Sequence, residues 1–374
     1  MPYRKSKEEI VDKGNYEDHA EILEQYSAED YPYYEANKVP NFVKYQEEVG
    51  WLDEMEKYWG KDWGSQGIGR LTDVAVRYPM PHEVHPMWSD DSAYFMAPKE
   101  FPSIEEIRTN HDMMTDILKE EGVNLHWWEF DFPPEGPHGL LKRTMSNIGL
   151  VINGGAIMPR AAAPWIRGRT RHAMQCYVEM GIPILLTIHG HGIHEIGATQ
   201  WLAENIWMTY LSTDGNQEAI DQITPVMRAS GVEHIQVTRP PGPHESFSWR
   251  DGHCMHLDMW FAPVDIGLVL LYPGFCDYET QRWLKSQNVE IIEVSEKEQR
   301  ESFPCNLIIL EPGKVMINGA AKETIKNLES RGIETISVDF DYAKSYGGGI
   351  KCATSFLRRD EGPHIEELGE GPAH

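Results

Sequence analysis

The chain has 374 residues, of which 41% are hydrophobic and 10% aromatic, so it can fold around a sizeable core. Its 34 basic and 59 acidic residues give a formal net charge of -25, which disfavours nucleic acid and anionic membranes as partners. The longest apolar run, about residues 266–272, is too short to cross a bilayer. The five cysteines include no C-x-x-C pair and the N-terminus lacks an apolar signal, so we expect reduced thiols in a cytoplasmic protein.

Residues 1–68 differ in composition from the rest of the chain. They are rich in Glu, Asp, Lys and Tyr, and residues 18–26 and 43–58 have the pattern of polar helices with aromatic stripes. One interpretation is that this extension docks on the main domain or on a second subunit, and docking on a second subunit would form a homo-oligomer. The other is that it is a solvated helical appendage. The aromatic residues available for docking are Trp51, Tyr58, Trp59 and Trp63.

From residue 69 to 364 the pattern repeats in the order strand, strand, helix, strand, and residues 365–374 form a polar tail. Each repeat lasts roughly 50 to 70 residues, which is longer than a solenoid unit and compatible with a closed ring of ββαβ modules. The predicted strands are 70–77, two within 147–158 that bend at Asn153-Gly154-Gly155, 183–188, strand material within 199–211, 234–237, 266–272, 289–294, 305–310, 314–318 and 335–339. The predicted helices are 168–180, 217–230, 279–285 and 322–331.

Near the C-terminus a glycine run ends in a cysteine, with the sequence Gly347-Gly348-Gly349-Ile350-Lys351-Cys352. Glycines allow positive φ angles and close approach of the backbone to a ligand, and a neighbouring ammonium lowers the pKa of a thiol. We therefore expect Lys351 to keep Cys352 reactive as a nucleophile. The alternative is a glycine-rich turn with a half-buried cysteine that packs as a small hydrophobe.

Two further segments carry acid–base groups. His256-Leu257-Asp258 is predicted to lie in a strand, where alternate side chains share one face, so the imidazole and the carboxylate would be presented together. Glu195 lies in a glycine-rich segment that follows a buried strand. A zinc hydrolase is a less favoured alternative, because no His-Glu-x-x-His occurs. Its ligands would come from His189, His191, His194, His253, Cys254 and His256.

Taken in chain order, Glu195, the pair His256 and Asp258, and the glycine run ending at Cys352 resemble the guanidino-group-modifying superfamily. This superfamily includes arginine deiminases, dimethylarginine dimethylaminohydrolases and glycine amidinotransferases. The resemblance runs from about Gly69 to Asp360. It implies a pentein fold, which is a five-bladed α/β propeller of ββαβ modules with pseudo-fivefold symmetry and the active site at its centre.

The resemblance also implies roles for these residues. Cys352 resembles the nucleophile, His256 the general acid and base, Glu195 the acid that supports the histidine, and Asp258 the carboxylate that holds substrate N–H groups. The implied reaction is covalent attack of the Cys352 thiolate on an amidine-like carbon, followed by release to water or to a second amine. Neither a metal nor a cofactor is expected. The further positions expected along the substrate pocket are Asn147, His194, Gly348 and Gly349.

The chain departs from the superfamily pattern where that pattern has aspartates. Ala198 ends the segment Glu195-Ile196-Gly197-Ala198, where Glu-Gly-Gly-Asp is usual, and Asn147 aligns with the aspartate of an Arg-Asp pair. Losing these carboxylates weakens the hold on a cationic guanidinium, so we expect a neutral or weakly basic substrate rather than free arginine. The competing interpretation is a misalignment, with Asp73 or another acid supplying the charge. Asp214 stands where many relatives have an arginine, which further disfavours a simple α-amino acid, although a helix cap is the alternative role.

The sequence thus predicts a cysteine-dependent hydrolase that cleaves a C–N bond of a small guanidine-, amidine- or ureido-type compound. The small-molecule substrate is the one partner expected. An amidinotransferase that uses the same intermediate with an amine acceptor is the nearest alternative.

Overall fold

The computed structural model describes residues 27, 29, 34–39, 43, 47–79, 103–128, 148–162, 167–239, 256–340 and 349–365. The chain divides into two compact units, Met1–Glu54 and Met55–His374. The second unit begins before residue 69, because Trp63 and Ile68 are buried in its core. Residues 55–68, assigned above to the extension, therefore belong to this compact unit.

The helix expected over residues 43–58 is not continuous. Residues 49 and 50 are not helical, and the 3-10 turn η2 covers Leu52–Glu54 in the first unit. The short helix α4 (Met55–Trp59) opens the second unit. Gly50 accounts for the break, since glycine is a poor helix former. The helix expected over residues 18–26 lies outside the described residues.

The second unit contains five three-stranded sheets, each with one antiparallel and one parallel strand pair. In each sheet a helix connects the middle strand to the strand parallel to it, which is the predicted ββαβ module. The modules are β15 (Ser355–Arg359), β1 (Leu71–Val76), α6 (Ile104–Glu120), β2 (Asn124–Trp127); β3 (Leu150–Ile152), β4 (Gly155–Met158), α7 (Arg169–Glu179), β5 (Ile184–Thr187); β6 (Thr199–Ala203), β7 (Ile206–Tyr210), α8 (Gln217–Ala229), β8 (His234–Thr238); β9 (Phe261–Asp265), β10 (Leu268–Leu271), α9 (Tyr278–Ser286), β11 (Glu290–Glu293); and β12 (Ile308–Glu311), β13 (Lys314–Asn318), α11 (Lys322–Glu329), β14 (Glu334–Val338).

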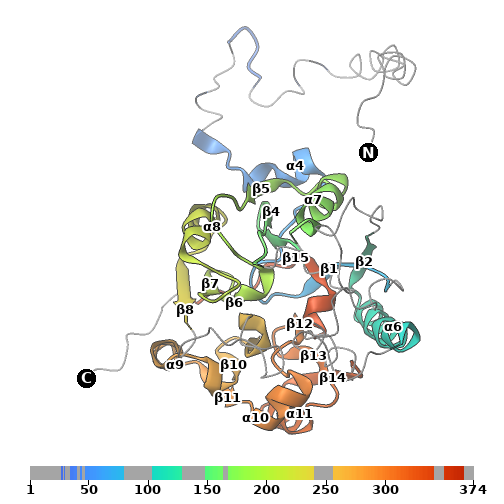
Figure 1. Cartoon of the computed structure of the whole chain (residues 1–374). Helices are drawn as coiled ribbons and strands as arrows, with labels where there is room; N and C mark the ends of the chain where they lie inside the picture. Colours follow the sequence, from blue (N-terminus) through green and yellow to red (C-terminus); the bar gives the residue numbers. More distant parts are fainter. Residues whose placement is uncertain are drawn as a thin grey trace. The chain divides into compact units, whose positions relative to one another are not determined.

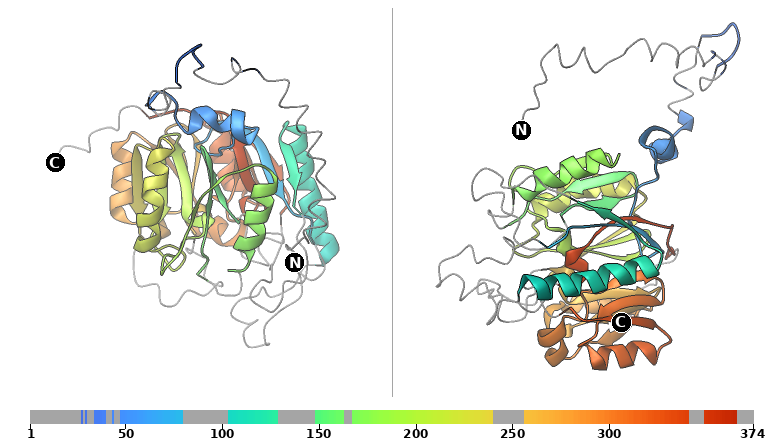
Figure 2. Two further views of the ribbon diagram at one scale, coloured as in Figure 1. Left: turned by 90° about the horizontal axis from the view of Figure 1, so that it is seen from above. Right: turned by 90° about the vertical axis from the view of Figure 1, so that its right-hand side faces the viewer.

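The predicted α/β fold of ββαβ modules is confirmed for the second unit: the strands form the interior, and α6, α7, α8, α9 and α11 lie around it (Figures 1 and 2). The helical N-terminal extension stays a prediction, because most of its residues lie outside the described ranges. The sequence analysis did not predict α6, β2, β9 or the additional helix α10 (Glu296–Ser302). None of the described helices is long and apolar enough to span a membrane.

Polar side chains start several of the helices. Asn216 accepts a hydrogen bond from the Ala219 backbone N–H at the start of α8, and Asp277 accepts one from Thr280 at the start of α9. Ser103 forms a reciprocal capping box at the start of α6. These side chains satisfy N–H groups that have no partner within the helix, so they fix where each helix begins.

The two ends of the compact unit meet in one sheet. β15, the last strand, pairs antiparallel with β1, the first, which closes the ring (Figure 1). The first strand of each module lines the centre, where side chains from β3, β6, β9, β12 and β15 surround one cavity. Loops that precede these central strands therefore lie near the axis of the ring.

Asp73 in β1 anchors the closing sheet electrostatically. The Lys61 ammonium lies 2.6 Å and the His126 ring nitrogen 2.9 Å from its carboxylate, which is 1% exposed. Burial would raise the pKa of Asp73, but hydrogen bonds from His126, Lys61 and Thr72 outweigh it and hold the pKa well below its usual range. Asp73 is engaged here and does not line the catalytic pocket described below.

Replacing Asp73 by Asn should lower the free energy of unfolding by roughly 2 kcal/mol, less than for a fully buried pair because both partners are partly exposed. Because the pKa of Asp73 is lower in the folded protein than in the unfolded chain, the ionised carboxylate stabilises the fold at any pH above 3.8, its pKa in the unfolded chain. This stabilisation is lost as the pH falls through the pKa of the folded protein. In urea unfolding, the difference in unfolding free energy between the wild type and Asp73→Asn should thus be largest near pH 7 and decrease at acidic pH. Asp116→Asn, which removes an exposed pair with Lys119, is the control and should change little. An equal deficit at acidic and neutral pH would contradict this account.

Candidate active site

Three 3-10 turns carry the predicted catalytic residues to one place. Glu195 directly precedes η6 (Ile196–Ala198), His256 directly precedes η7 (Leu257–Met259), and Cys352 lies within η9 (Lys351–Ala353). Each turn leads into the first strand of a module, namely β6, β9 and β15. Because equivalent loops of the modules lie around one axis, residues more than a hundred positions apart in the chain meet at the same pocket.

The pocket has a volume of about 460 Å³ and brings together Cys352, His256 and Glu195. The structure therefore assembles the three residues predicted to be catalytic. The other residues that line it are Ile148, Pro159, Ala161, Arg169, Thr170, Ile196 and Gly197.

His256 lies between two carboxylates. Its Nε2 atom is 3.5 Å from Glu195 Oε2 and 3.7 Å from Asp214 Oδ2, and all three side chains are largely buried. Burial alone would lower the pKa of His256, but the contact with Glu195 and the charge of Asp214 outweigh it and raise the pKa to about 9. The imidazole is thus protonated at neutral pH in the free protein.

The pKa values of the two carboxylates, Glu195 and Asp214, shift in opposite directions. Burial opposes ionisation of Glu195, yet contact with His256 lowers its pKa overall, and the Ala162 backbone N–H donates a 3.0 Å hydrogen bond to Glu195 Oε1. Burial and the neighbouring Glu195 charge raise the pKa of Asp214 to about 7. The cluster Glu195–His256–Asp214 can therefore bind or release one proton near neutral pH, which is the property that acid–base catalysis needs.

Gly197 allows His256 to occupy this position. A Cβ atom on Gly197 would lie 2.3 Å from His256 Cγ and 2.3 Å from Nδ1, closer than any side chain tolerates. The glycine of the Glu195-Ile196-Gly197-Ala198 segment is thus required by the close approach of the imidazole ring.

The thiol of Cys352 is buried, with 4% of the residue exposed. Its backbone N–H donates to Asn306 Oδ1 at 3.4 Å. Burial and the nearby Asp258 charge raise the pKa of Cys352 to about 12, and the opposing effects of Gly349, Asn306 and Lys351 do not compensate. The free protein therefore holds a neutral thiol, which corrects the expectation that Lys351 keeps the thiol ionised.

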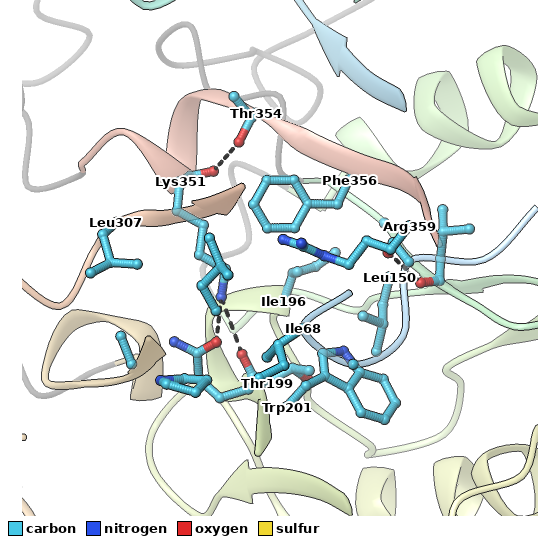
Figure 3. Close-up of a pocket in the computed structure, with 18 residues that line it drawn as sticks. Ile68, Leu150, Ile196, Thr199, Trp201, Leu307, Lys351, Thr354, Phe356 and Arg359 are labelled. Atoms are coloured by element: carbon cyan, nitrogen blue, oxygen red, sulfur yellow. Dashed lines mark hydrogen bonds between the residues drawn. The ribbon is translucent and has the colours of Figure 1, made fainter. Parts of the chain in front are cut away.

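Lys351 has other partners. Its Nζ atom lies 3.3 Å from Asp258 Oδ2 and 3.0 Å from Gln200 Oε1, so the ammonium extends into the central cavity (Figure 3).

Asp258 does not line the catalytic pocket with His256. The strand expected here is instead the 3-10 turn η7, in which residues two apart point in different directions. Asp258 is fully buried and faces Lys351.

The structure does not place the remaining predicted pocket residues in one common site. His194 is 2% exposed, its Nε2 hydrogen-bonds Thr209 Oγ1 at 3.1 Å, and it does not line the pocket. Gly349 packs against Asn306, where a Cβ atom would lie 2.3 Å from Oδ1, so close approach rather than a positive φ requires glycine there. Asn147 and Gly348 lie outside the described residues, although Ile148, the next residue after Asn147, lines the pocket.

The part of the chain that the structure describes contains no group of three or more His, Cys, Asp or Glu side chains placed to hold a metal ion. His189 and His191 are exposed, and burial lowers the pKa of His194 to about 4. His253 and Cys254 lie outside the described residues. The histidines that the structure describes thus do not gather into a metal site.

Sequence reasoning missed two charged groups of the site. Arg169, at the start of α7, lines the pocket, and its charge contributes to the lowered pKa of Glu195. Asp214 is not the cap of α8, which is Asn216, but a buried neighbour of His256. The local sequence carries no signal for either contact, because each depends on packing between modules.

The pH dependence of alkylation should reveal the neutral thiol. With a pKa of about 12, Cys352 should react with iodoacetamide at a rate that rises about tenfold per pH unit between pH 7 and 10, because only the thiolate is nucleophilic. Peptide mapping by mass spectrometry would follow Cys352 separately from the other four cysteines. A rate that levels off below pH 8 would show that the thiol is already ionised at neutral pH.

Comparison with known proteins supports the same family. No family model matches the chain. A 2-nitroimidazole nitrohydrolase from Mycobacterium sp. (strain JS330) is 27% identical over 329 residues, which cover 84% of this chain and 86% of the relative. The glycine amidinotransferase of Gallus gallus is 29% identical over 120 residues, which cover only 30% of this chain and 28% of that protein.

Solved structures decide the fold. Dimethylarginine dimethylaminohydrolase from Pseudomonas aeruginosa, complexed with citrulline, superposes with a TM-score of 0.59 at 18% identity, covering 76% of this chain and 99% of that one. The chain has the pentein fold. The pentein SxtG, an amidinotransferase from Microseira wollei, gives a TM-score of 0.62 at 16% identity and covers 82% of this chain and 99% of that one. The resemblance inferred from the sequence is thus confirmed, and the pentein relatives are hydrolases and amidinotransferases.

Proposed function

We propose that the protein is a cysteine-dependent hydrolase that cleaves the bond between an amidine-like carbon and an attached nitrogen group in a small, uncharged compound. The observation that carries the proposal is the convergence of Cys352, His256 and Glu195 on one pocket. A nucleophile, an acid–base group and a carboxylate that supports it are what covalent C–N hydrolysis needs.

The charges around the pocket support an uncharged substrate. Arg169 lines the pocket, and His256 is protonated at neutral pH. Among the carboxylates, Asp258 is paired with Lys351, and Asp214 is partly protonated near pH 7. In the described part of the pocket, Glu195 is thus the main negative charge, and His256 already balances it. A cationic guanidinium would gain little here, whereas a neutral group avoids repulsion from Arg169.

The relative that matches 84% of the chain supports a narrower substrate class. The name 2-nitroimidazole nitrohydrolase describes removal of a nitro group from a ring carbon that is bonded to three nitrogens. Such a carbon has the bonding pattern of a guanidine without its positive charge. We infer that nitro-substituted carbons of this kind, in a nitroimidazole or a nitroguanidine, are the first compounds to test.

The reaction we propose has two steps. The Cys352 sulfur bonds to the sp² carbon while its proton passes to the Glu195–His256–Asp214 cluster, and the nitrogen group leaves with the electrons of the C–N bond. Water then attacks the same carbon and gives up a proton to the cluster, and the sulfur leaves as thiolate and takes one proton back from the cluster. The other proton is released to solvent or goes to the leaving group. With a nitro group the leaving species is nitrite, which needs no proton. With an amine the cluster must return the proton.

A substrate panel tests this function directly. The purified protein would be incubated with 2-nitroimidazole, nitroguanidine, citrulline, arginine and dimethylarginine, with detection of nitrite and ammonia and with intact-mass analysis for an adduct on Cys352. We expect turnover of an uncharged compound and incorporation of ¹⁸O from labelled water into the product. Turnover restricted to free arginine would refute the uncharged-substrate proposal. Product formation that requires an added amine and takes up no ¹⁸O would identify a transferase.

A further inference from the structure

The central cavity of the ring is distinct from the catalytic pocket. It has a volume of about 620 Å³, and the first strand of every module contributes to its wall. Most of the lining is apolar or neutral, including Leu150, Trp201, Leu307 and Phe356 (Figure 3). Ile196 lines both spaces, so the cavity lies next to the catalytic pocket.

Two cations and no described carboxylate line this cavity. The cations are Lys351 and Arg359, and Figure 3 shows both side chains extending into the same space. The Lys351 ammonium donates hydrogen bonds to Gln200 Oε1 at 3.0 Å and to the Thr199 carbonyl at 3.4 Å, and it forms an ion pair with Asp258 Oδ2 at 3.3 Å. The Lys351 charge is therefore satisfied.

Arg359 differs from Lys351. It is 7% exposed, and among the described residues its guanidinium donates one hydrogen bond, from Nη1 to the Gly69 carbonyl at 2.7 Å. Its Cζ atom lies 4.9 Å from the centre of the Phe356 ring. A guanidinium has five N–H donors, so most of them face the cavity without a described protein acceptor.

The nearest carboxylate does not neutralise Arg359. Glu204 is the carboxylate whose charge acts on Arg359, but among the described residues the guanidinium donates its hydrogen bond to a backbone carbonyl and not to an Asp or Glu oxygen. The Glu204 oxygens accept hydrogen bonds from Asn153 Nδ2 at 3.0 Å and from the Gly362 backbone N–H at 3.1 Å. Burial also raises the pKa of Glu204, which reduces its charge. A buried cation without a counter-charge is costly, and a bound anion removes that cost.

We propose that the central cavity binds a small monovalent anion, held by the Arg359 guanidinium beside the Phe356 ring. One unpaired cation in an otherwise neutral cavity matches a single negative charge. The apolar wall favours a weakly hydrated ion of the size of bromide or nitrite over phosphate or sulfate. The site is separate from the chemistry at Cys352 and does not depend on which substrate the enzyme takes.

Bromide is the probe, because it is detected by anomalous X-ray scattering. Crystals of the full chain soaked in sodium bromide should show an anomalous peak within hydrogen-bond distance of an Arg359 nitrogen. In solution, the melting temperature of the wild type should rise saturably in bromide relative to the same concentration of gluconate, a strongly hydrated anion that the apolar wall disfavours. Arg359→Gln should lose both the peak and the rise.

The matched control is Arg282→Gln, which removes the same charge from the partly exposed side of α9. It should retain the full response to bromide. If Arg359→Gln does not fold, the wild-type diffraction experiment still decides, and Arg359→Lys, which keeps the charge, should retain a weaker response. Bromide peaks confined to the protein surface, or an equal rise in melting temperature in wild type and Arg359→Gln, would overturn the proposal.

Discussion

Replacing Cys352 by alanine should abolish turnover of any substrate found in the panel, with a loss of roughly four to six orders of magnitude, because Cys352 supplies the one thiol among the described residues that line the pocket. The adduct seen by intact mass should also disappear. Cys352 packs with Met259 and Phe303, so the truncation should cost only about 1 kcal/mol of folding free energy. The variant should therefore fold and still bind substrate.

The control is Cys276→Ala, which truncates a buried cysteine that precedes α9 and does not line the pocket. It should show a comparable loss of stability and normal turnover. Residual turnover of more than a few per cent in Cys352→Ala, with a normal melting temperature, would show that Cys352 is structural and that another group performs the attack.

Replacing His256 by asparagine should separate the two halves of the reaction. We expect overall turnover to fall by roughly 10²- to 10⁴-fold, the usual contribution of an acid–base group. With a nitro compound the leaving group needs no proton, and Glu195 and Asp214 remain to accept the thiol proton, so the thioether adduct on Cys352 should form more slowly but still accumulate. With an amine leaving group the adduct should not form, because the proton donor is absent.

His234→Asn is the matched control for this substitution. His234 is half-buried in β8, stacks on Trp283 with ring centroids 5.0 Å apart, and does not line the pocket. Its substitution should leave turnover and adduct formation unchanged. Rapid turnover by His256→Asn, or equal adduct formation with nitro and amine leaving groups, would remove His256 from the acid–base role.

The sequence was sufficient to predict the repeating module, although not its elements α6, β2 and β9, and to predict the three residues that meet in the pocket. Both follow from local pattern and order along the chain: short apolar strands next to amphipathic helices, and motif residues just before the central strands. Glu195, His256 and Cys352 are brought together by the symmetry of the modules, which does not depend on the details of each loop.

The directions of the side chains could not be predicted in the same way. A strand and a 3-10 turn place residues i and i+2 differently, and the segment from His256 to Asp258 forms the turn, so Asp258 faces Lys351 instead of the pocket. Asp214 and Arg169 were missed because their importance comes from contacts between modules. The raised pKa of the thiol likewise depends on burial that no local motif encodes.

Closure of the ring by β15 has a consequence for biosynthesis. Cys352 stands directly before that strand, so the nucleophile and the strand that completes the ring leave the ribosome together, after Glu195, Asp214 and His256. An incomplete chain that ends before residue 352 contains the proton-transfer groups but no nucleophile. We therefore expect substrate-dependent labelling of Cys352 only in chains that have completed the ring, so that the labelling would serve as a readout of completed folding.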